Sequence, residues 1–203
     1  MKGNLFIVSA PSGAGKTSLV NALVERHNEI RLSVSHTTRQ PRDGEKDGQD
    51  YFFVSPTQFK QMQAQGEFLE SALVFDNYYG TSVKAVQSLL DDGFDVILEI
   101  DWQGAQQVRH NFADSVGIFI LPPSKATLEQ RLRSRGQDNE AIIQRRMRDA
   151  ENEISHYVEF DYLIVNDAFE QALSSLTAIV LAQRYQLTIQ KEKQAALISE
   201  LLA

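Results

Sequence analysis

Residues 10–17, with the sequence APSGAGKT, constrain the fold of this chain more than any other segment. An apolar run precedes them at residues 5–8, and a helix-like run begins near Lys16. A strand, a glycine-bearing loop and a helix N-terminus in this order form a cradle for phosphate, because the loop amides point inward and the helix dipole lies behind them. The order therefore predicts an α/β fold whose first loop, the P-loop, binds a nucleoside triphosphate.

Single positions of the P-loop have separate roles in this hypothesis. We expect Lys16 to reach the β- and γ-phosphates and the Thr17 hydroxyl to bind Mg²⁺. The sequence departs from G-x-x-x-x-G-K-[ST] only at Ala10, where the first glycine belongs. A glycine-rich turn that binds nothing is the alternative, and the flanking strand and helix argue against it. The predicted triphosphate-binding residues are Ala10, Pro11, Ser12, Gly13, Ala14, Gly15, Lys16 and Thr17.

Charge and composition narrow the class of protein. The net charge of −7 argues against general nucleic-acid binding. No apolar run approaches the roughly 18 residues of a membrane helix, and the start MKGNLF lacks the apolar segment of a signal peptide. Cysteine is absent, which excludes disulfides and thiolate metal sites and suits a reducing compartment. We therefore expect a cytoplasmic protein that binds neither nucleic acid nor a membrane.

Arginines are concentrated in one part of this acidic chain. Half of the 12 arginines lie between Arg131 and Arg148. Such a cluster favours binding of a small polyanion, because each guanidinium offers several charged donors. A solvated helix face is the alternative interpretation.

Strand-like and helix-like runs alternate, which favours an α/β fold with a largely parallel sheet. The predicted strands are residues 4–9, 31–35, 95–100, 115–121 and 162–165. The predicted helices are residues 16–27, 82–92, 125–135 and 139–156, with a last helix from Phe169 almost to the end.

The section 36–82 breaks this alternation, since its β-rich runs have no long helices between them. Its predicted elements are strands at 51–54 and 68–75, a turn at 77–80, and a helix that begins after Ser55 and ends at Gly66. We interpret the section as an inserted α+β subdomain.

A second phosphate site is predicted in the same section. Arg39 and Arg42 lie in an irregular segment, because Pro41 bars a regular helix. Tyr51 and Tyr79 stand at the ends of β-like runs, and forked guanidinium donors with phenolic O–H donors suit a phosphate monoester. Alternatively, the arginines are ordinary surface residues and the tyrosines are half-buried core residues.

Glu70 indicates which base the acceptor carries. It stands in the strand-like sequence FLESALVF, beside apolar residues. Guanine presents N1–H and N2–H₂ as adjacent donors that one carboxylate accepts, and adenine lacks this pair. Ser35 and Thr81 could serve the O6 side with their hydroxyls. A solvent-facing strand residue is the alternative for Glu70.

The chain resembles bacterial guanylate kinases, a family of P-loop nucleoside monophosphate kinases, from about Gly3 to beyond Leu181. The matching pieces occur in family order and are SAPSGAGKTSL, SVSHTTRQPRDGE, DYFFV, NYYGTS, EIDWQGA, RLRSRGQD and YLIVND. The resemblance implies a three-layer P-loop NTPase fold and transfer of the γ-phosphoryl group of ATP to GMP or dGMP, with Mg²⁺.

The resemblance also assigns residues. It implies a GMP site formed by Ser35, Arg39, Arg42, Tyr51, Glu70, Tyr79, Thr81 and Glu99. Glu99 stands where family members commonly have Asp, so its reach is one methylene longer. Asp101 matches a carboxylate associated with Mg²⁺, and a helix N-cap is its alternative role. The lid arginines are Arg131, Arg135 and Arg146, and Asn166 with Asp167 matches the adenine-side loop, for which turn chemistry is the alternative.

The implied mechanism needs no strong general base, because the acceptor phosphate is already largely ionised. Catalysis is expected to come from positioning and charge stabilisation. The catalytic residues are Lys16, Arg39, Arg135 and Arg146.

The implied domain organisation is one kinase domain, 3–182, and a C-terminal helical extension, 183–203. The domain divides into a core of 3–35, 83–124 and 157–182, a GMP-binding subdomain of 36–82 and a lid of 125–156. Leucines at helical spacing follow Phe169, and they predict packing on the sheet for the first half. The end could instead pack on another subunit and form a homo-oligomer.

Two rival functions remain at this point. Another P-loop kinase would accept a different nucleotide or a phosphorylated sugar. A scaffold domain of the same family would recognise phosphopeptides without catalysis, but such domains lose the P-loop lysine, and Lys16 is present here.

Overall fold

The computed structural model describes residues 2–74, 76–134 and 140–203. Its central sheet has five strands in the order β2-β7-β1-β8-β9. All of its neighbouring strands pair in parallel. The strands are β1 (Leu5–Ser9), β2 (Ile30–Leu32), β7 (Asp95–Glu99), β8 (Val116–Leu121) and β9 (Tyr162–Val165). The sequence located all five, although β2 is shorter than predicted and leaves Ser35 in the following loop.

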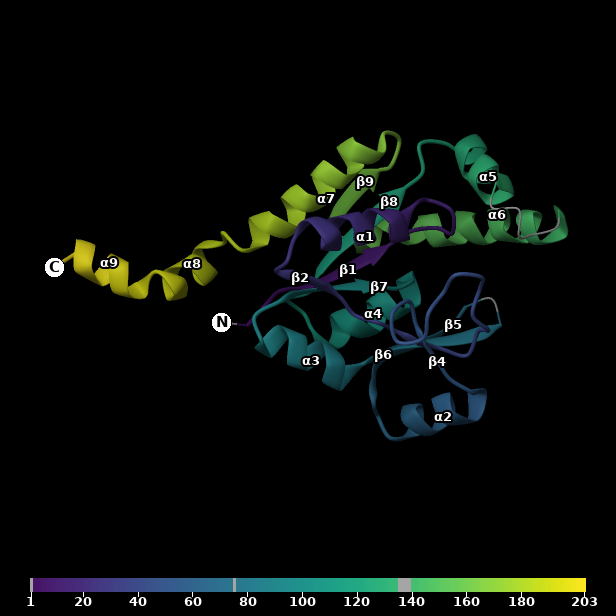
Figure 1. Cartoon of the computed structure of the whole chain (residues 1–203). Helices are drawn as coiled ribbons and strands as arrows, with labels where there is room; N and C mark the ends of the chain where they lie inside the picture. Colours follow the sequence, from purple (N-terminus) through teal and green to yellow (C-terminus); the bar gives the residue numbers. More distant parts are fainter. Residues whose placement is uncertain (1, 75, 135–139) are drawn as a thin grey trace.

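Helices cover both faces of this sheet and make three layers (Figure 1). Helices α1 (Lys16–Arg26) and α7 (Phe169–Gln183) pack on one face, and α3 (Val83–Asp91) and α4 (Trp102–Asn111) pack on the other. Phe6 and Val8 of β1 belong to the first core, whereas Leu5 and Ile7 belong to the second. Alternation along β1 therefore buries both sides of the strand, and each such side chain contributes about 2 kcal/mol.

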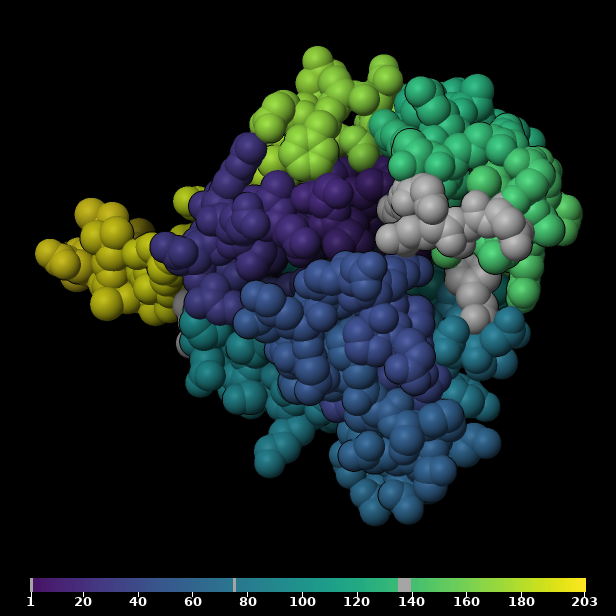
Figure 2. Space-filling view, turned by 45° about the vertical axis from the view of Figure 1, so that its right-hand side comes forward, coloured from purple at the N-terminus to yellow at the C-terminus, as the bar shows by residue number. Residues whose placement is uncertain are grey.

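A second sheet, with the order β4-β3-β6-β5, lies in section 36–82. Its elements are β3 (His36–Thr37), β4 (Phe52–Phe53), β5 (Phe68–Val74), β6 (Asn77–Ser82) and the helix α2 (Pro56–Ala64). The Ser55 side chain accepts from the Gln58 amide at 3.2 Å and so caps α2, as the sequence predicts. Figure 2 shows the section in blue, below the purple N-terminal segment.

The predicted turn at 77–80 is wrong, because these residues begin β6. The strand pairs antiparallel with β5, and Asn77 lies opposite Val74. Asp76 has φ 67°, so the chain reverses before Asn77 rather than after it. Asn and Gly are typical of turns, but pairing with β5 makes these residues a strand.

The arginine-rich segment forms two helices, α5 (Lys125–Ser134) and α6 (Glu140–Ser155), followed by a 3₁₀ turn at His156–Glu159. Leu128 and Leu132 of α5 pack with Ala150 of α6 in a small core of their own. Arg135 lies outside the described residues, so the prediction for it stays open.

The C-terminal segment divides where the sequence predicts one long helix. Leu173, Leu176 and Val180 of α7 are buried in the core. The chain then forms α8 (Leu187–Lys193) and α9 (Ala195–Leu201), which extend away from the sheet (Figure 1). Leu187 and Leu201 are 81% and 75% exposed, so the predicted packing on the sheet ends with α7. Within the described ranges, no helix is long and apolar enough to cross a lipid bilayer.

Candidate active site

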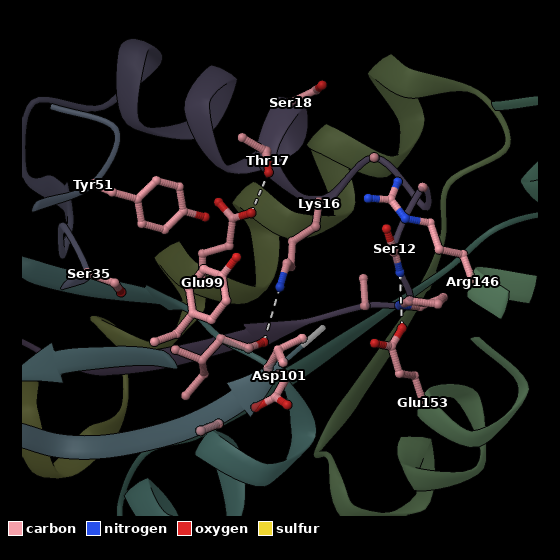
Figure 3. A pocket seen from close by; sticks show the side chains of 18 of the residues that line it. Ser12, Lys16, Thr17, Ser18, Ser35, Tyr51, Glu99, Asp101, Arg146 and Glu153 are labelled. Atoms are coloured by element: carbon pink, nitrogen blue, oxygen red, sulfur yellow. Dashed lines mark hydrogen bonds between the residues drawn. The ribbon is translucent and has the colours of Figure 1, made fainter. Parts of the chain in front are cut away.

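A central cavity of about 220 Å³ lies where the P-loop, the end of β7, the second sheet and α6 meet (Figure 3). Parallel strands end at the same edge of a sheet, so the loop after β1 and the residues after β7 reach this cavity together. The predicted residues that line it are Ala10, Pro11, Ser12, Gly13, Gly15, Lys16, Thr17, Ser35, Arg42, Tyr51, Glu70, Tyr79, Glu99, Asp101 and Arg146.

The P-loop backbone has the conformation that only glycine adopts without strain. Gly13 and Gly15 have φ 97° and 93°. A Cβ on Gly15 would stand 2.4 Å from the Asn166 amide nitrogen. The backbone conformation and this steric clash therefore both exclude a side chain at Gly15. Among the described contacts, α1 has no side-chain N-cap and no acidic residue in its first turn. Its amides and dipole are therefore available to an anion.

Lys16 and Thr17 face the end of β7. The Lys16 ammonium donates to the Ile100 carbonyl at 3.1 Å. The Thr17 hydroxyl donates to the Glu99 carboxylate. Glu99 pairs with Val8 at the end of β1, so the parallel register brings it to the start of α1. Its longer side chain thus reaches Thr17.

Asp101 acts as a helix cap in this structure. Its carboxylate accepts from the Gly104 amide at 2.9 Å and from the Gln103 side chain at 3.0 Å, at the N-terminus of α4. The same residue lines the central cavity. Glu99, rather than Asp101, is the carboxylate in contact with Thr17.

Glu70 is a buried carboxylate at the floor of the acceptor side. It is 3% exposed and accepts from the Thr81 hydroxyl at 2.6 Å, and Thr81 lies 3.2 Å from the Ser35 hydroxyl. Burial raises the pKa of Glu70 to about 7, and the nearby Asp101 adds to this effect. Its second oxygen lies against α4, where a Cβ on Gly104 would come within 2.6 Å of it. Glycine at this position permits the close approach.

The predicted acceptor-phosphate ligands divide into two groups. Arg42, Tyr51 and Tyr79 line the central cavity, but Arg39 does not. Burial raises the pKa of the Tyr51 hydroxyl to about 12, so Tyr51 stays a neutral O–H donor.

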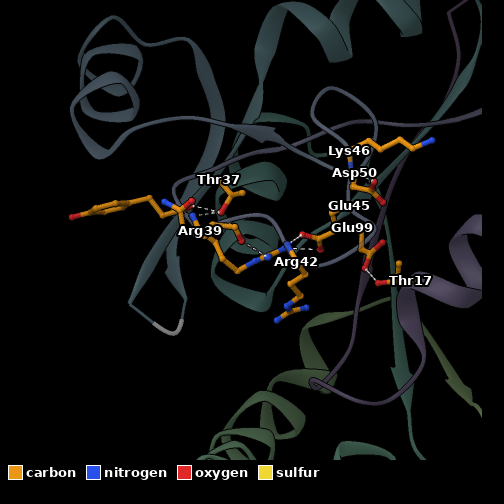
Figure 4. A network of polar contacts seen from close by, with 10 residues as sticks. Thr17, Thr37, Arg39, Arg42, Glu45, Lys46, Asp50 and Glu99 are labelled. Carbon is orange, nitrogen blue, oxygen red and sulfur yellow. Dashed lines mark hydrogen bonds and ion pairs between the residues drawn. The ribbon is translucent and has the colours of Figure 1, made fainter. Parts of the chain in front are cut away.

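Arg39 is held beside the cavity by Glu45, a residue that the sequence did not identify (Figure 4). The two side chains form an ion pair at 2.8 Å and are 13% and 18% exposed. Burial lowers the pKa of Arg39, but the contacts with Glu45 and Tyr79 together outweigh burial and the net shift is upward. Glu45 also accepts from the Arg42 amide at 2.7 Å, so it orders both arginines.

Four other predicted residues lie behind the cavity rather than in its lining. Asn166 donates to the Ala14 carbonyl at 2.8 Å, and Arg131 donates to the Asn166 carbonyl at 3.0 Å. These contacts brace the P-loop from its outer side. Thr81 is fully buried and contacts the cavity through Glu70.

A family model described as guanylate kinase matches residues 2–183. The chain belongs to the guanylate kinase family. A guanylate kinase of Nitrosococcus oceani is 58% identical over 202 residues, which covers 100% of both chains. The guanylate kinase of Escherichia coli K12 is 55% identical over 204 residues, covering 100% of this chain and 99% of its own.

A solved guanylate kinase has the same fold. The crystal structure from Anaplasma phagocytophilum matches with a TM-score of 0.78 and 35% identity, covering 92% of this chain and 88% of that one. The predicted family and the predicted α/β fold of the P-loop NTPase type are therefore confirmed. As a member of the guanylate kinase family, the protein is a kinase and hence a transferase.

The cavity of this guanylate kinase family member also has lining residues that the sequence analysis did not single out. They are Ser18, Ala72, Val74, Ile100 and Glu153. Only Glu153 is charged, and it accepts from the Ser12 amide at 3.0 Å. Its position seven residues after Arg146 on one predicted helix was the available signal, because that spacing places both on one face.

Proposed function

We propose that the protein transfers the γ-phosphoryl group of ATP to GMP or dGMP, which yields ADP and GDP or dGDP. One observation carries the proposal: a single cavity is lined both by the P-loop and by Glu70, Arg42, Tyr51 and Tyr79. The P-loop suits a triphosphate donor. The other residues suit the base and the phosphate of a guanine monophosphate.

Glu70 supports guanine rather than another base. Its carboxylate faces the cavity and would accept from both N1–H and N2–H₂. Adenine lacks this donor pair, so the Thr81 hydroxyl would remain the donor to a buried carboxylate that faces the base, which strongly disfavours adenine binding. The Ser35 hydroxyl lines the cavity and would contact the base edge, whereas the buried Thr81 hydroxyl joins Ser35 to Glu70 and acts through Glu70.

The transfer itself follows an in-line path in our proposal. A GMP phosphate oxygen attacks the γ-phosphorus, and no residue removes a proton from it. Lys16 and Arg146 line the cavity and would stabilise charge on the transferring group. Arg39 would act on the acceptor phosphate by exchanging Glu45 for it, and the role of Arg135 stays a prediction.

We assign the metal position to the Thr17 hydroxyl and the Glu99 carboxylate. Both are oxygen donors on the cavity wall, which is the donor set that Mg²⁺ prefers. Among the described residues, no group of three or more His, Asp or Glu side chains could hold a metal. Two oxygen donors fit a Mg²⁺ ion that is held mainly by nucleotide phosphates and water. The ion would supply charge neutralisation at the β- and γ-phosphates.

The predicted domain division fits this chemistry. We propose a core of 3–35, 83–124 and 157–182 that binds ATP, a GMP-binding subdomain of 36–82, and a lid of 125–156 that closes over both nucleotides. Closure would exclude water, which otherwise hydrolyses ATP. We keep the cytoplasm as the predicted compartment, because a cysteine-free chain suits a reducing environment.

Association of copies through 183–203 is a separate proposal. The exposed apolar side chains of α8 and α9, such as Leu187 and Leu201, support it. Sedimentation of the full chain and of a chain that ends at residue 184 tests it. The same number of chains per particle in both samples would contradict it.

A coupled ADP-release assay tests the proposed reaction. We expect turnover with GMP and dGMP, and at least 100-fold lower kcat/KM with AMP, UMP and a ribose phosphate. Preference for any of the other acceptors would refute guanine specificity. Calorimetry with Mg-ATP distinguishes the scaffold alternative, because a phosphopeptide-binding domain without catalysis would not bind it.

A further inference from the structure

The contact between Glu153 and Ser12 joins two segments that lie 141 residues apart. The Glu153 carboxylate accepts from the Ser12 amide at 3.0 Å. Figure 3 shows Glu153 pointing from α6 to the P-loop. Both residues line the central cavity, together with Arg146 from the same helix.

An anion thus already uses one of the amides expected to hold phosphate. A carboxylate and a phosphate oxygen make the same charge-assisted bond to a backbone N–H. One N–H cannot serve both at full strength, and two anions at this distance repel each other. ATP bound at the P-loop and Glu153 bound to Ser12 therefore compete.

The surroundings of Glu153 favour its displacement. Burial raises the pKa of Glu153, and Asp101 and Asp149 add repulsion, whereas the Ser12 amide and Lys16 attract the carboxylate. A phosphate group carries more charge and more acceptor atoms than a carboxylate. It would take the Ser12 amide and the attraction of Lys16.

Helix geometry couples this exchange to the proposed lid arginine. Arg146 and Glu153 are seven residues apart, so they share one face of α6 about 10 Å apart along its axis. Release of Glu153 removes one contact between that face and the P-loop. The same triphosphate attracts Arg146.

We propose that Glu153 is an internal competitor of the terminal phosphate of ATP. It holds the Ser12 amide until a triphosphate arrives, and its displacement lets α6 bring Arg146 to the reacting phosphates. The inference rests on the proposed function, since it takes ATP as the donor. Glu153 is a positioning residue, and it makes the lid respond to the third phosphate rather than to any adenine nucleotide.

Calorimetric titration tests the proposal with Mg²⁺ and the β,γ-imido analogue of ATP, and with ADP. Glu153→Gln removes the charge and keeps the shape. We expect the variant to bind the analogue about tenfold tighter than the original chain, whereas its affinity for ADP changes less than twofold. An unchanged or weaker affinity for the analogue, or an equal gain for ADP, would overturn the proposal.

Glu151→Gln is the matched control. Glu151 lies on the same helix and pairs with Lys125 at the surface, so this variant makes the same charge change away from the P-loop. We expect its analogue affinity to stay within twofold. A tenfold gain here would assign the effect to overall charge and contradict the specific role of Glu153.

The unaltered chain gives a second test that does not depend on the stability of a variant. Trp102, the one tryptophan, stacks on His156 with ring centroids 3.6 Å apart, directly after α6. We expect the triphosphate analogue to change Trp102 fluorescence at least twice as much as ADP does. Equal responses would contradict the proposal. Neither measurement uses GMP, so a failure of GMP phosphorylation would refute the proposed function separately.

Discussion

The two halves of the site are built in different ways. The P-loop consists of eight consecutive residues and presents backbone amides held by two glycines at positive φ. The acceptor side consists of side chains from separate segments around a buried carboxylate whose pKa is shifted. The donor half therefore depends on backbone geometry, and the acceptor half depends on side-chain charge. An added Cβ should break the first, and a change of charge or pH should break the second.

The largest effect should come from Arg146, at the junction of the two halves. We expect Arg146→Ala to lower kcat about 1,000-fold, because charge on the transferring group loses its partner. GMP affinity should stay within twofold in equilibrium titration. Arg148→Ala is the control, since Arg148 is exposed on the same helix. Equal losses of turnover and GMP affinity would exclude a role specific to the transition state.

Loss of the Glu70 charge should affect only the acceptor half. We expect Glu70→Gln to lower kcat/KM for GMP about 100-fold, since the amide cannot accept from both guanine donors. Affinity for the ATP analogue should not change. Glu67→Gln, an exposed change of the same kind, is the control. Full GMP turnover by Glu70→Gln would contradict the proposed recognition of guanine by Glu70.

The same variant should be more stable than the original chain at pH 8. The folded pKa of Glu70 is about 7 against an ordinary value of 4.5, so ionisation of the buried group costs about 3 kcal/mol. This penalty is nearly absent below pH 4.5, grows between pH 4.5 and 7, and is fully present above pH 7. Urea unfolding at pH 8 and pH 5 should show the gain mainly at pH 8.

An added Cβ should damage only the donor half. We expect Gly15→Ala to weaken binding of the ATP analogue about 30-fold, because alanine is strained at φ 93° and its Cβ meets Asn166. Gly66→Ala isolates the strain, since Gly66 has φ 70° but a Cβ there would meet no atom of the described residues within 4 Å. GMP affinity that falls as much as analogue affinity would show that the halves are not independent.

The smallest effect concerns the pH dependence of KM for the two substrates. Guanine needs the ionised carboxylate, so KM for GMP should rise about fivefold from pH 7 to pH 6, as Glu70 becomes protonated. The KM for ATP should change less. Glu70→Gln retains the titration of the GMP phosphate but lacks that of Glu70. If KM for GMP rises as much in this variant as in the original chain, the pH dependence comes from GMP itself rather than from Glu70.

Local patterns predicted most of the fold. The alternation of strands and helices, the Ser55 cap and the glycine that follows α3 all depend on neighbouring residues, and the structure confirms them. The prediction of a turn at 77–80 was wrong because pairing with β5 outweighed local composition. The prediction of one long C-terminal helix was wrong after α7, where buried contacts with the sheet end.

The sequence alone determined the donor loop, because its strand, glycines, lysine and threonine are contiguous. It also determined that the chain has the residue types of a guanine and phosphate site. Only the tertiary structure decided that Thr17 contacts Glu99, that Glu45 keeps Arg39 beside the cavity, and that Glu153 reaches Ser12. The contacts of Glu99 and Glu153 join segments more than 80 residues apart, and the short-range contact of Glu45 depends on a loop folded against the second sheet. Such contacts depend on how sheets and helices pack, which no local pattern specifies.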